Sequence, residues 1–228
     1  MLGKSTGNVG ATFKDRADGG KKLAQELSKY GGRSDVVVLG LPRGGVPVAY
    51  EVAKKLDAPL DVFIVRKLGV PGHEELAMGA IASGGVRVLN DEVVNGVNVS
   101  EDDIDRVATK EQQELERRES AYRGERPGIA LEDKTVLLVD DGLATGASMR
   151  AAVKGLREHN PKKIIVAVPT APPETCEAFS DLADEAICLE TPSPFMGVGA
   201  WYEDFPQTKD EEVKDILERA SERLAQTE

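Results

Sequence analysis

The sequence predicts an α/β fold with a parallel, doubly wound sheet, and three observations support this prediction. Short apolar runs rich in β-branched residues recur along the 228 residues, as buried strands require. Stretches with apolar residues at helical spacing separate these runs. Turns containing glycine join the first and third strands to the helices that follow them. Strands that alternate with helices favour a parallel sheet with right-handed crossovers, and the length suits one domain.

The first part of the chain is expected to alternate between helix and strand. A helix near residues 15–30 places Leu23, Ala24 and Leu27 on one side, and Gly31-Gly32 ends it. The following elements are a strand over 36–39, a turn over 40–45, a helix up to 56 and a strand over 60–65. Residues 66–85 show no firm periodicity and are expected to form a mobile loop whose glycines act as hinges.

The pattern changes between residues 86 and 130, which we expect to form an insertion or arm within a single domain. Ser100 with Asp103 resembles a helix start, and the stretch through Tyr122 is dense in Glu and Arg. A solvated helix with internal ion pairs explains this stretch, and a dimer arm is the alternative. The remaining elements are strands over 136–139, 164–168 and 186–189 and an amphipathic helix over 211–224.

Composition restricts the classes of function. The net charge of −11 and pI near 4.9 repel nucleic acid and anionic membrane, so we expect neither partner. No apolar run approaches the roughly 20 residues of a membrane span, and the N-terminus lacks the apolar core of a signal peptide, so a cytoplasmic protein is expected. Cys176 and Cys188 have no CxxC partner, and both are expected to be reduced packing residues.

The most informative stretch is 136–148, VLLVDDGLATGAS, which runs from a buried strand through two acids into a small-residue turn and a helix. Backbone N–H groups at such a helix start, together with the hydroxyls of Thr145 and Ser148, suit a phosphate. Asp140 and Asp141 would repel phosphate, but their oxygens accept hydrogen bonds from vicinal hydroxyls or from water around Mg²⁺. A sugar phosphate such as ribose 5-phosphate satisfies both halves of the pattern.

This stretch resembles the signature of the type I phosphoribosyltransferases for phosphoribosyl pyrophosphate (PRPP), and the whole signature is matched. An ordinary strand, turn and capped helix is the structural alternative. The resemblance implies a Mg²⁺-dependent transferase that moves ribose 5-phosphate from PRPP to a nucleobase, expected to be a purine, as in nucleotide salvage. The implied PRPP-binding residues are Asp140, Asp141, Gly142, Ala144, Thr145, Gly146, Ala147 and Ser148, and the two acids are also metal candidates.

Two further segments resemble parts of the same family. Pro42, Arg43, Gly44 and Gly45 resemble its pyrophosphate loop, for which the resemblance implies a cis peptide at Pro42–Arg43. The resemblance of the opening of the segment 66–75 to adenine enzymes makes its charged residues catalytic candidates. With Arg43, the catalytic candidates are Arg66, Lys67, Glu74 and Glu75.

The segment 191–228 is expected to supply a small hood and a C-terminal helix. Its aromatic run loosely resembles the base-binding segment of purine enzymes, with Phe195 and Met196 at the base and Glu203 near the metal. Packing of Trp201, Tyr202 and Phe205 between the terminal helix and the core is the alternative.

The 6-oxopurine enzymes carry an acid immediately before the loop threonine, whereas this chain has Ala144, as in the adenine enzymes. A homodimer is expected. Two other functions stay open, a non-catalytic regulatory protein that binds PRPP and a receiver-like module that binds Mg²⁺ with its acidic pair.

Overall fold

The computed structural model describes residues 12–226, and a five-stranded parallel sheet forms its centre. The expectation about a signal peptide concerns residues outside this range. The strands follow the order β2-β1-β6-β7-β8, and each neighbouring pair is parallel. Their bounds are β1 Val36–Gly40, β2 Leu60–Val62, β6 Thr135–Val139, β7 Lys163–Thr170 and β8 Glu185–Glu190. The predicted parallel sheet is confirmed.

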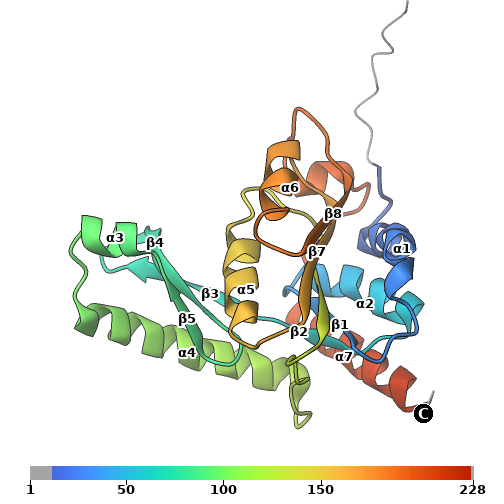
Figure 1. Ribbon diagram of the computed structural model, residues 1–228, viewed down its shortest axis with the longest axis horizontal. Coiled ribbons are helices and arrows are strands. Elements are labelled where there is room, and N and C mark those ends of the chain that lie inside the picture. The colour runs from blue at the N-terminus through green and yellow to red at the C-terminus, as the bar shows by residue number, and fades with distance from the viewer. Residues whose placement is uncertain (1–11, 227–228) are drawn as a thin grey trace, which may run out of the picture.

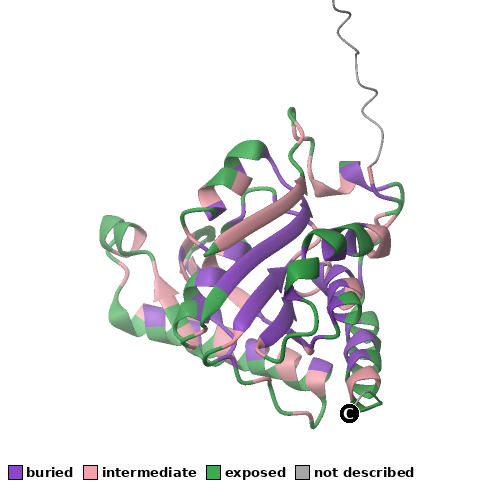
Figure 2. Ribbon diagram, turned by 45° about the vertical axis from the view of Figure 1, so that its right-hand side comes forward, coloured by how far each residue is buried: buried purple, intermediate pink, exposed green. Residues whose placement is uncertain are grey.

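Helices cover both faces of this sheet, which makes it doubly wound as predicted (Figure 1). One apolar cluster joins the sheet to α1 (Arg16–Glu26), α2 (Gly45–Leu56) and α7 (Asp210–Ala225). A second cluster joins the opposite face to α5 (Ala147–Arg157) and α6 (Pro173–Phe179). Strands β1 and β6 are buried throughout their length, because side chains on both of their faces lie under helices (Figure 2).

A second, antiparallel sheet projects from the core beside α5 (Figure 1). It consists of β3 (Val65–Val70), β4 (His73–Ala82) and β5 (Val86–Leu89), in the order β3-β4-β5. The predicted strand over 60–65 is therefore wrong as one element. The chain leaves the parallel sheet at Phe63, and Ile64 N–H bonds to the Ser83 hydroxyl at 2.9 Å before β3 begins.

The expectation of a mobile, hinged loop over 66–85 is also wrong, since most of this segment is a β-hairpin. Gly69 and Gly79 lie within its strands, where a Cβ atom would overlap the carbonyl oxygens of Glu74 and Val88. These two glycines allow close approach of backbones. Gly72 and the pair Gly84-Gly85 adopt positive φ in the turns, which only glycine adopts without cost.

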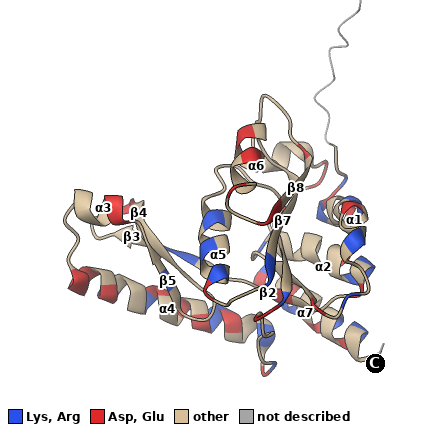
Figure 3. Cartoon of the chain, in the orientation of Figure 1, with Lys and Arg blue, Asp and Glu red and all other residues tan. Residues whose placement is uncertain are grey.

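Helix α4 (Glu101–Arg123) runs along the projecting sheet and continues to the core, where it packs on α7. The Ser100 hydroxyl accepts a hydrogen bond from Asp103 N–H, which confirms the predicted helix start. Charged residues of both signs line its exposed surface (Figure 3), but Ile104, Leu115 and Tyr122 are buried. A short helix, α3 (Asp91–Gly96), precedes it, and the 3₁₀ turns η1 (Ser28–Tyr30) and η2 (Val198–Trp201) complete the fold.

The two cysteines form a disulfide between α6 and β8, so the prediction of reduced packing residues is wrong. Cys176 and Cys188 are 12 residues apart in sequence and belong to different elements. Only the packing of α6 against β8 brings them together, and no local pattern in the sequence reports that contact. Among the described helices, none is long and apolar enough to cross a membrane.

Candidate functional site

The two loops singled out in the sequence begin side by side. Gly40, the last residue of β1, pairs with Val139, the last residue of β6. Leu41 N–H then bonds to the Val139 carbonyl at 2.9 Å, so the loop after β1 starts against the loop after β6. Both loops lie at the carboxyl ends of neighbouring parallel strands, where open α/β sheets bind ligands.

The acidic pair after β6 fits into space left by the two glycines after β1. A Cβ atom on Gly44 would overlap Asp141 Oδ2, and one on Gly45 would lie 2.9 Å from Asp140 Oδ1. Asp141 N–H also donates to Asp140 Oδ1 at 2.8 Å. The glycines of the predicted pyrophosphate loop therefore also make room for the predicted ribose-binding carboxylates.

Burial and mutual repulsion dominate the electrostatics of this pair. Burial raises the pKa of Asp140 well above its usual value, and the charge of Asp141 raises it further. Burial also raises the pKa of Asp141, although the neighbouring Arg16 guanidinium opposes that rise. Two acids are thus held close together in a poorly hydrated place, an arrangement that stability alone does not favour.

The predicted phosphate loop is accessible, as a ligand would require. Ala144, Thr145, Ala147 and Ser148 are exposed, and α5 begins at Ala147. Gly146 adopts a φ of 72°, and a Cβ atom there would lie 2.7 Å from the Phe179 ring. The amides at this helix start are therefore presented to solvent on a turn that only glycine suits.

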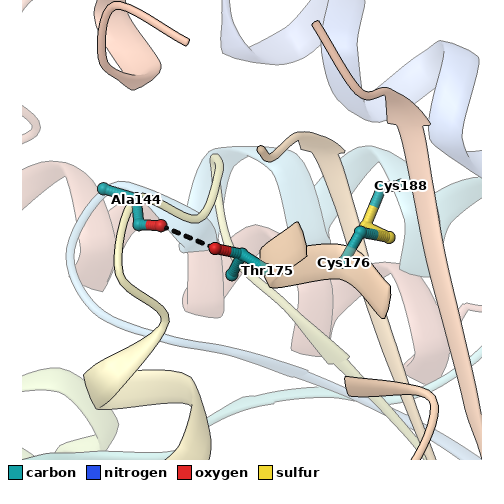
Figure 4. Close-up of a disulfide and its surroundings, with 4 residues drawn as sticks. All are labelled: Ala144, Thr175, Cys176 and Cys188. Carbon is teal, nitrogen blue, oxygen red and sulfur yellow. Dashed lines mark hydrogen bonds between the residues drawn. A yellow bond between two sulfur atoms is a disulfide. The ribbon is translucent and has the colours of Figure 1, made fainter. Parts of the chain in front are cut away.

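Helix α6 contacts this loop through a side-chain hydrogen bond. The Thr175 hydroxyl donates to the Ala144 carbonyl at 3.1 Å (Figure 4). The next residue, Cys176, forms the disulfide with Cys188 of β8. The phosphate loop is thus connected through one short helix to the edge strand of the sheet.

Arg43 lies at the mouth of the loop after β1. The Pro42–Arg43 peptide is cis, which confirms the prediction from the sequence. The Arg43 guanidinium Nη1 is 3.7 Å from Asp210 Oδ1 at the start of α7, and the side chain is about one third exposed. Arg43 could therefore bind an anion in place of Asp210, because its ion pair with Asp210 is long and partly exposed.

The other catalytic candidates lie on the projecting hairpin, and the structure brings all four of them to one cavity. Arg66 bonds to Glu111 of α4, with Nη2 and Oε2 2.6 Å apart. Lys67 lines a cavity of about 340 Å³ that Ser148 of the phosphate loop also lines. It also lines a second cavity, of about 550 Å³, together with the other three candidates, Arg66, Glu74 and Glu75. Glu74 and Glu75 are exposed near the hairpin turn, and Lys67 Nζ is 3.5 Å from Glu75 Oε2.

The aromatic run near the C-terminus packs against the N-terminal segment instead of the terminal helix. Trp201 and Tyr202 form a buried cluster with Phe13, and Phe195 stacks on Trp201 at a centroid distance of 6.4 Å. The docking of these aromatics onto the terminal helix is therefore not what the structure shows. Met196 is 73% exposed, on the loop that follows the cis Ser193–Pro194 peptide.

The structure also brings in residues that the sequence analysis did not select. Arg16 Nε donates to Asp141 Oδ2 at 2.8 Å, and the Tyr202 hydroxyl donates to the Asp141 carbonyl at 2.6 Å. Arg16 is 125 positions from its partner, in a helix whose pattern reports only an apolar face. No sequence signal marks either contact.

Within residues 12–226, no group of three or more His, Cys, Asp or Glu side chains could hold a metal ion by itself. Asp140 and Asp141 offer adjacent carboxylate oxygens, the donors that Mg²⁺ prefers. Glu203 is exposed, and its N–H bonds to the Phe13 carbonyl.

Comparison with known proteins defines the class to which this fold and site belong. The phosphoribosyl transferase domain family matches residues 11–199, so the chain belongs to the phosphoribosyl transferase family. Two proteins of Mycobacterium tuberculosis, from strains CDC 1551 and H37Rv, are each 50% identical over 214 residues, and their names assign them to the phosphoribosyl transferases. The alignments cover 94% of this chain and 48% of each relative, so the chain spans about half their length.

A solved structure shows a similar fold over most of the chain. The crystal structure of TT1426 from Thermus thermophilus matches with a TM-score of 0.79 at 43% sequence identity. The match covers 90% of this chain and 97% of the other. Most of this chain's architecture is therefore shared with the Thermus thermophilus protein.

Proposed function

We propose that this protein transfers the 5-phosphoribosyl group of PRPP to a ring nitrogen of a nucleobase and releases pyrophosphate. The observation that carries the proposal is the meeting of two loops at the ends of β1 and β6. One supplies the basic side chain of Arg43 and two glycines that leave room for the acids, and the other supplies an acidic pair and an exposed helix start. Together they offer sites for a diphosphate, a diol and a phosphate in sequence.

Each part of PRPP has a matching group in this arrangement. The amides and hydroxyls of 145–148 suit the 5-phosphate, because they are donors at the positive end of α5. Asp140 and Asp141 suit the ribose hydroxyls, which donate hydrogen bonds. Arg43 and the Gly44 amide suit the pyrophosphate, which leaves as the new bond forms.

The reaction forms a bond from the acceptor nitrogen to C1 of the ribose and breaks the bond from C1 to the pyrophosphate oxygen. Positive charge develops at C1, so positioning and charge stabilisation supply most of the catalysis. The acceptor nitrogen must also lose a proton. Glu74 and Glu75 of the projecting hairpin are the candidate bases.

Mg²⁺ belongs to this proposal as a partner of the substrate. When bound at the acidic pair, the ion would neutralise charge on the leaving pyrophosphate. Asp140 and Asp141 would hold it through water or directly, and Glu203 is the third candidate.

We further propose a purine as the acceptor. Ala144 leaves the phosphate loop without the acid that 6-oxopurine enzymes carry, which favours adenine or a related base. Phe195 and Met196 offer one ring and one flexible apolar side chain for stacking. Specificity among bases depends on a few hydrogen bonds, so an activity panel is the direct test.

The test is pyrophosphate release from PRPP and Mg²⁺ with adenine, hypoxanthine, guanine, xanthine, uracil or orotate. Turnover above the blank without base, largest for a purine, is the expected result. Tight PRPP binding without turnover of any base would favour a regulatory protein that binds PRPP. Absence of PRPP binding would overturn both functions.

Two substitutions connect the activity to the site. Asp141→Ala and Arg43→Ala should each lower turnover by about 100-fold or more, because each removes a charged contact to the reacting sugar or its leaving group. Arg117→Ala is a matched control, since Arg117 pairs with Glu114 on the exposed surface of α4. Wild-type turnover in both site variants, with folding intact, would contradict the assignment.

A homodimer completes the proposed assembly, with the projecting sheet and α4 as the arm. Val97, at the end of α3, is 47% exposed on this arm. Light scattering of the purified chain is expected to give twice the monomer mass of 24.5 kDa, and a mass of one chain would remove this part of the proposal.

A further inference from the structure

Arg16, at the first position of α1, makes three contacts at the edge of the proposed ribose site. Its Nε donates to Asp141 Oδ2 at 2.8 Å, and its Nη1 donates to the Pro206 carbonyl at 2.6 Å. Its guanidinium carbon lies 3.7 Å from the centroid of the Phe205 ring. The side chain is only 11% exposed, which is unusual for arginine without a specific partner.

The contacts join the segments 13–16 and 201–206 to the acidic pair. Phe13 N–H bonds to the Trp201 carbonyl at 3.0 Å, and Glu203 N–H bonds to the Phe13 carbonyl at 2.8 Å. Tyr202 lies between these segments, stacked on Phe205, and its hydroxyl donates to the Asp141 carbonyl. Asp141 is thus held at its backbone by the C-terminal segment and at its carboxylate by the N-terminal helix.

The same contacts fix the direction of the Asp141 carboxylate. Oδ2, the oxygen bound by Arg16, occupies the space that a side chain on Gly44 would fill. Arg16 Nε itself would lie 3.3 Å from a Cβ atom on Gly44. The guanidinium therefore lies beside the loop after β1 and the acid after β6 at once, and it holds one carboxylate oxygen against that loop.

We propose that Arg16 is a positioning residue for PRPP, which holds Asp141 against Gly44 so that its other carboxylate oxygen accepts a ribose hydroxyl. This inference rests on the proposed function. Arg16 carries the positive charge that the carboxylate needs in a buried place, and the Phe205 ring and the Pro206 carbonyl keep that charge in one orientation. Lysine cannot make all three contacts, because it has a single terminal nitrogen and no planar fork.

The test compares Arg16→Gln, Arg16→Lys and a control, Arg33→Gln, in the full chain. Arg33 also pairs with an aspartate, Asp35, but this pair precedes β1, whereas the site follows that strand. PRPP binding is measured by calorimetry with Mg²⁺, and KM for PRPP and for the base are measured in the assay that proves active. Melting curves accompany each variant.

Arg16→Gln is expected to raise Kd and KM for PRPP by about tenfold or more, as loss of a charged hydrogen bond implies. KM for the base should stay within about twofold, since the contact concerns the sugar. Arg16→Lys should fall between wild type and Arg16→Gln, and Arg33→Gln should match wild type. A general loss of packing would raise both KM values together, and that result would overturn the proposal.

Two results would prevent the main comparison, and a separate measurement covers each of them. If Arg16→Gln does not fold, Arg16→Lys decides, because a raised Kd for PRPP supports the proposal and an unchanged Kd overturns it. If the wild-type chain does not bind PRPP, the proposed function fails separately. Crystal structures of wild type and Arg16→Gln then test positioning alone, and an Asp141 carboxylate that stays against Gly44 without Arg16 overturns it.

Discussion

At the scale of single residues, Gly44 contributes to both loops of the candidate site. Its amide belongs to the loop after β1, while the space beside its Cα holds Asp141 Oδ2 from the loop after β6. A glycine in such a loop is easily explained by backbone freedom, yet Gly44 has a φ of −63°, which any residue adopts. Side-chain space, and not backbone conformation, is therefore the reason for glycine at this position.

Gly44→Ala is accordingly expected to displace Asp141 and to weaken PRPP binding by about tenfold or more, since a misplaced polar group costs about as much as a lost charged bond. The measurement is calorimetric titration of PRPP with Mg²⁺. Gly96→Ala is the matched control, because a Cβ atom at Gly96 would meet nothing within 4 Å. Equal affinities in the two variants would show that the recess is not needed.

Asp140 is expected to lower the stability of the folded protein, because its position in the site is buried and adjacent to a second acid. Burial and the charge of Asp141 raise its pKa, so the folded protein disfavours the ionised form relative to the unfolded chain. A raised carboxyl pKa lowers stability at pH values above the unfolded value of about 4, and this cost disappears as the pH falls.

Asp140→Asn should therefore raise the melting temperature at pH 7 by about 2 °C or more, the shift that about 1 kcal/mol produces in a chain of this size. The same variant should lose PRPP affinity, because the amide offers one acceptor oxygen instead of two. Scanning calorimetry of the variant beside Asp181→Asn, an exposed acid, makes the comparison. A lower melting temperature in Asp140→Asn would refute this account.

At the scale of elements, the strands and helices of the central sheet could be predicted because each shows its own period. β1 and β6 are continuous apolar runs, and α7 has an apolar stripe that is buried as expected. The hairpin could not be predicted, since β4 has exposed residues at one end and buried residues at the other. The burial of each residue in these strands depends on which neighbouring element it contacts, and not on a regular alternation along the strand.

The residues of the candidate site also fall into those that could be predicted from the sequence and those that could not. Residues that follow one another, such as those of 140–148, could be chosen from the sequence because their spacing carries the chemistry. Arg16, Thr175 and Tyr202 reach the site through tertiary contacts over about 30 to 125 positions, and nothing local marks them. The prediction for both cysteines failed for the same reason, because their contact depends on how α6 packs against β8.

The disulfide is expected to stabilise the fold and, through α6, the phosphate loop. It closes a short loop between elements, for which the chain-entropy estimate is about 2–3 kcal/mol. Replacing both cysteines by serine should therefore lower the melting temperature by about 4–10 °C in a chain of this size. PRPP affinity should fall as well, because Thr175 precedes Cys176 and bonds to Ala144 of the loop.

Melting curves and PRPP titrations with and without a dithiol reductant test this expectation. The wild-type chain should respond to the reductant, whereas the Cys176→Ser, Cys188→Ser double variant should not. If reductant leaves the wild-type melting curve unchanged while mass spectrometry shows that both thiols are free, the disulfide does not support the fold.

At the scale of the whole molecule, 40 acidic residues outnumber 29 basic residues. Some of these acids nevertheless stabilise the fold through ion pairs and hydrogen bonds. Lys29 and Tyr30 both donate to Glu185, and these bonds lower the pKa of that carboxyl. Arg117 and Arg118 together lower the pKa of Glu114 on α4 to about 2. The first group ties η1 to β8, and the second lies within the arm.

Acid should therefore unfold the protein at a pH set by these carboxylates. A carboxyl whose folded pKa is lowered adds stability above its unfolded pKa, and that stability is lost as the pH falls from about 4 through the folded value. Between about pH 8 and 5 the melting temperature should not fall, because protonation of Asp140 and Asp141, whose pKa values are raised, removes a cost to stability there. It should fall steeply only below about pH 4, where the carboxyls with lowered pKa values become protonated.

Glu185→Gln should make that fall shallower, because it removes one of the acids that must be protonated, whereas Glu203→Gln, at an exposed acid, should keep the wild-type slope. Circular dichroism melts in buffers from about pH 3 to 8 give the curves. A loss of stability centred near about pH 6 would point to histidine and would contradict the assignment to these carboxylates.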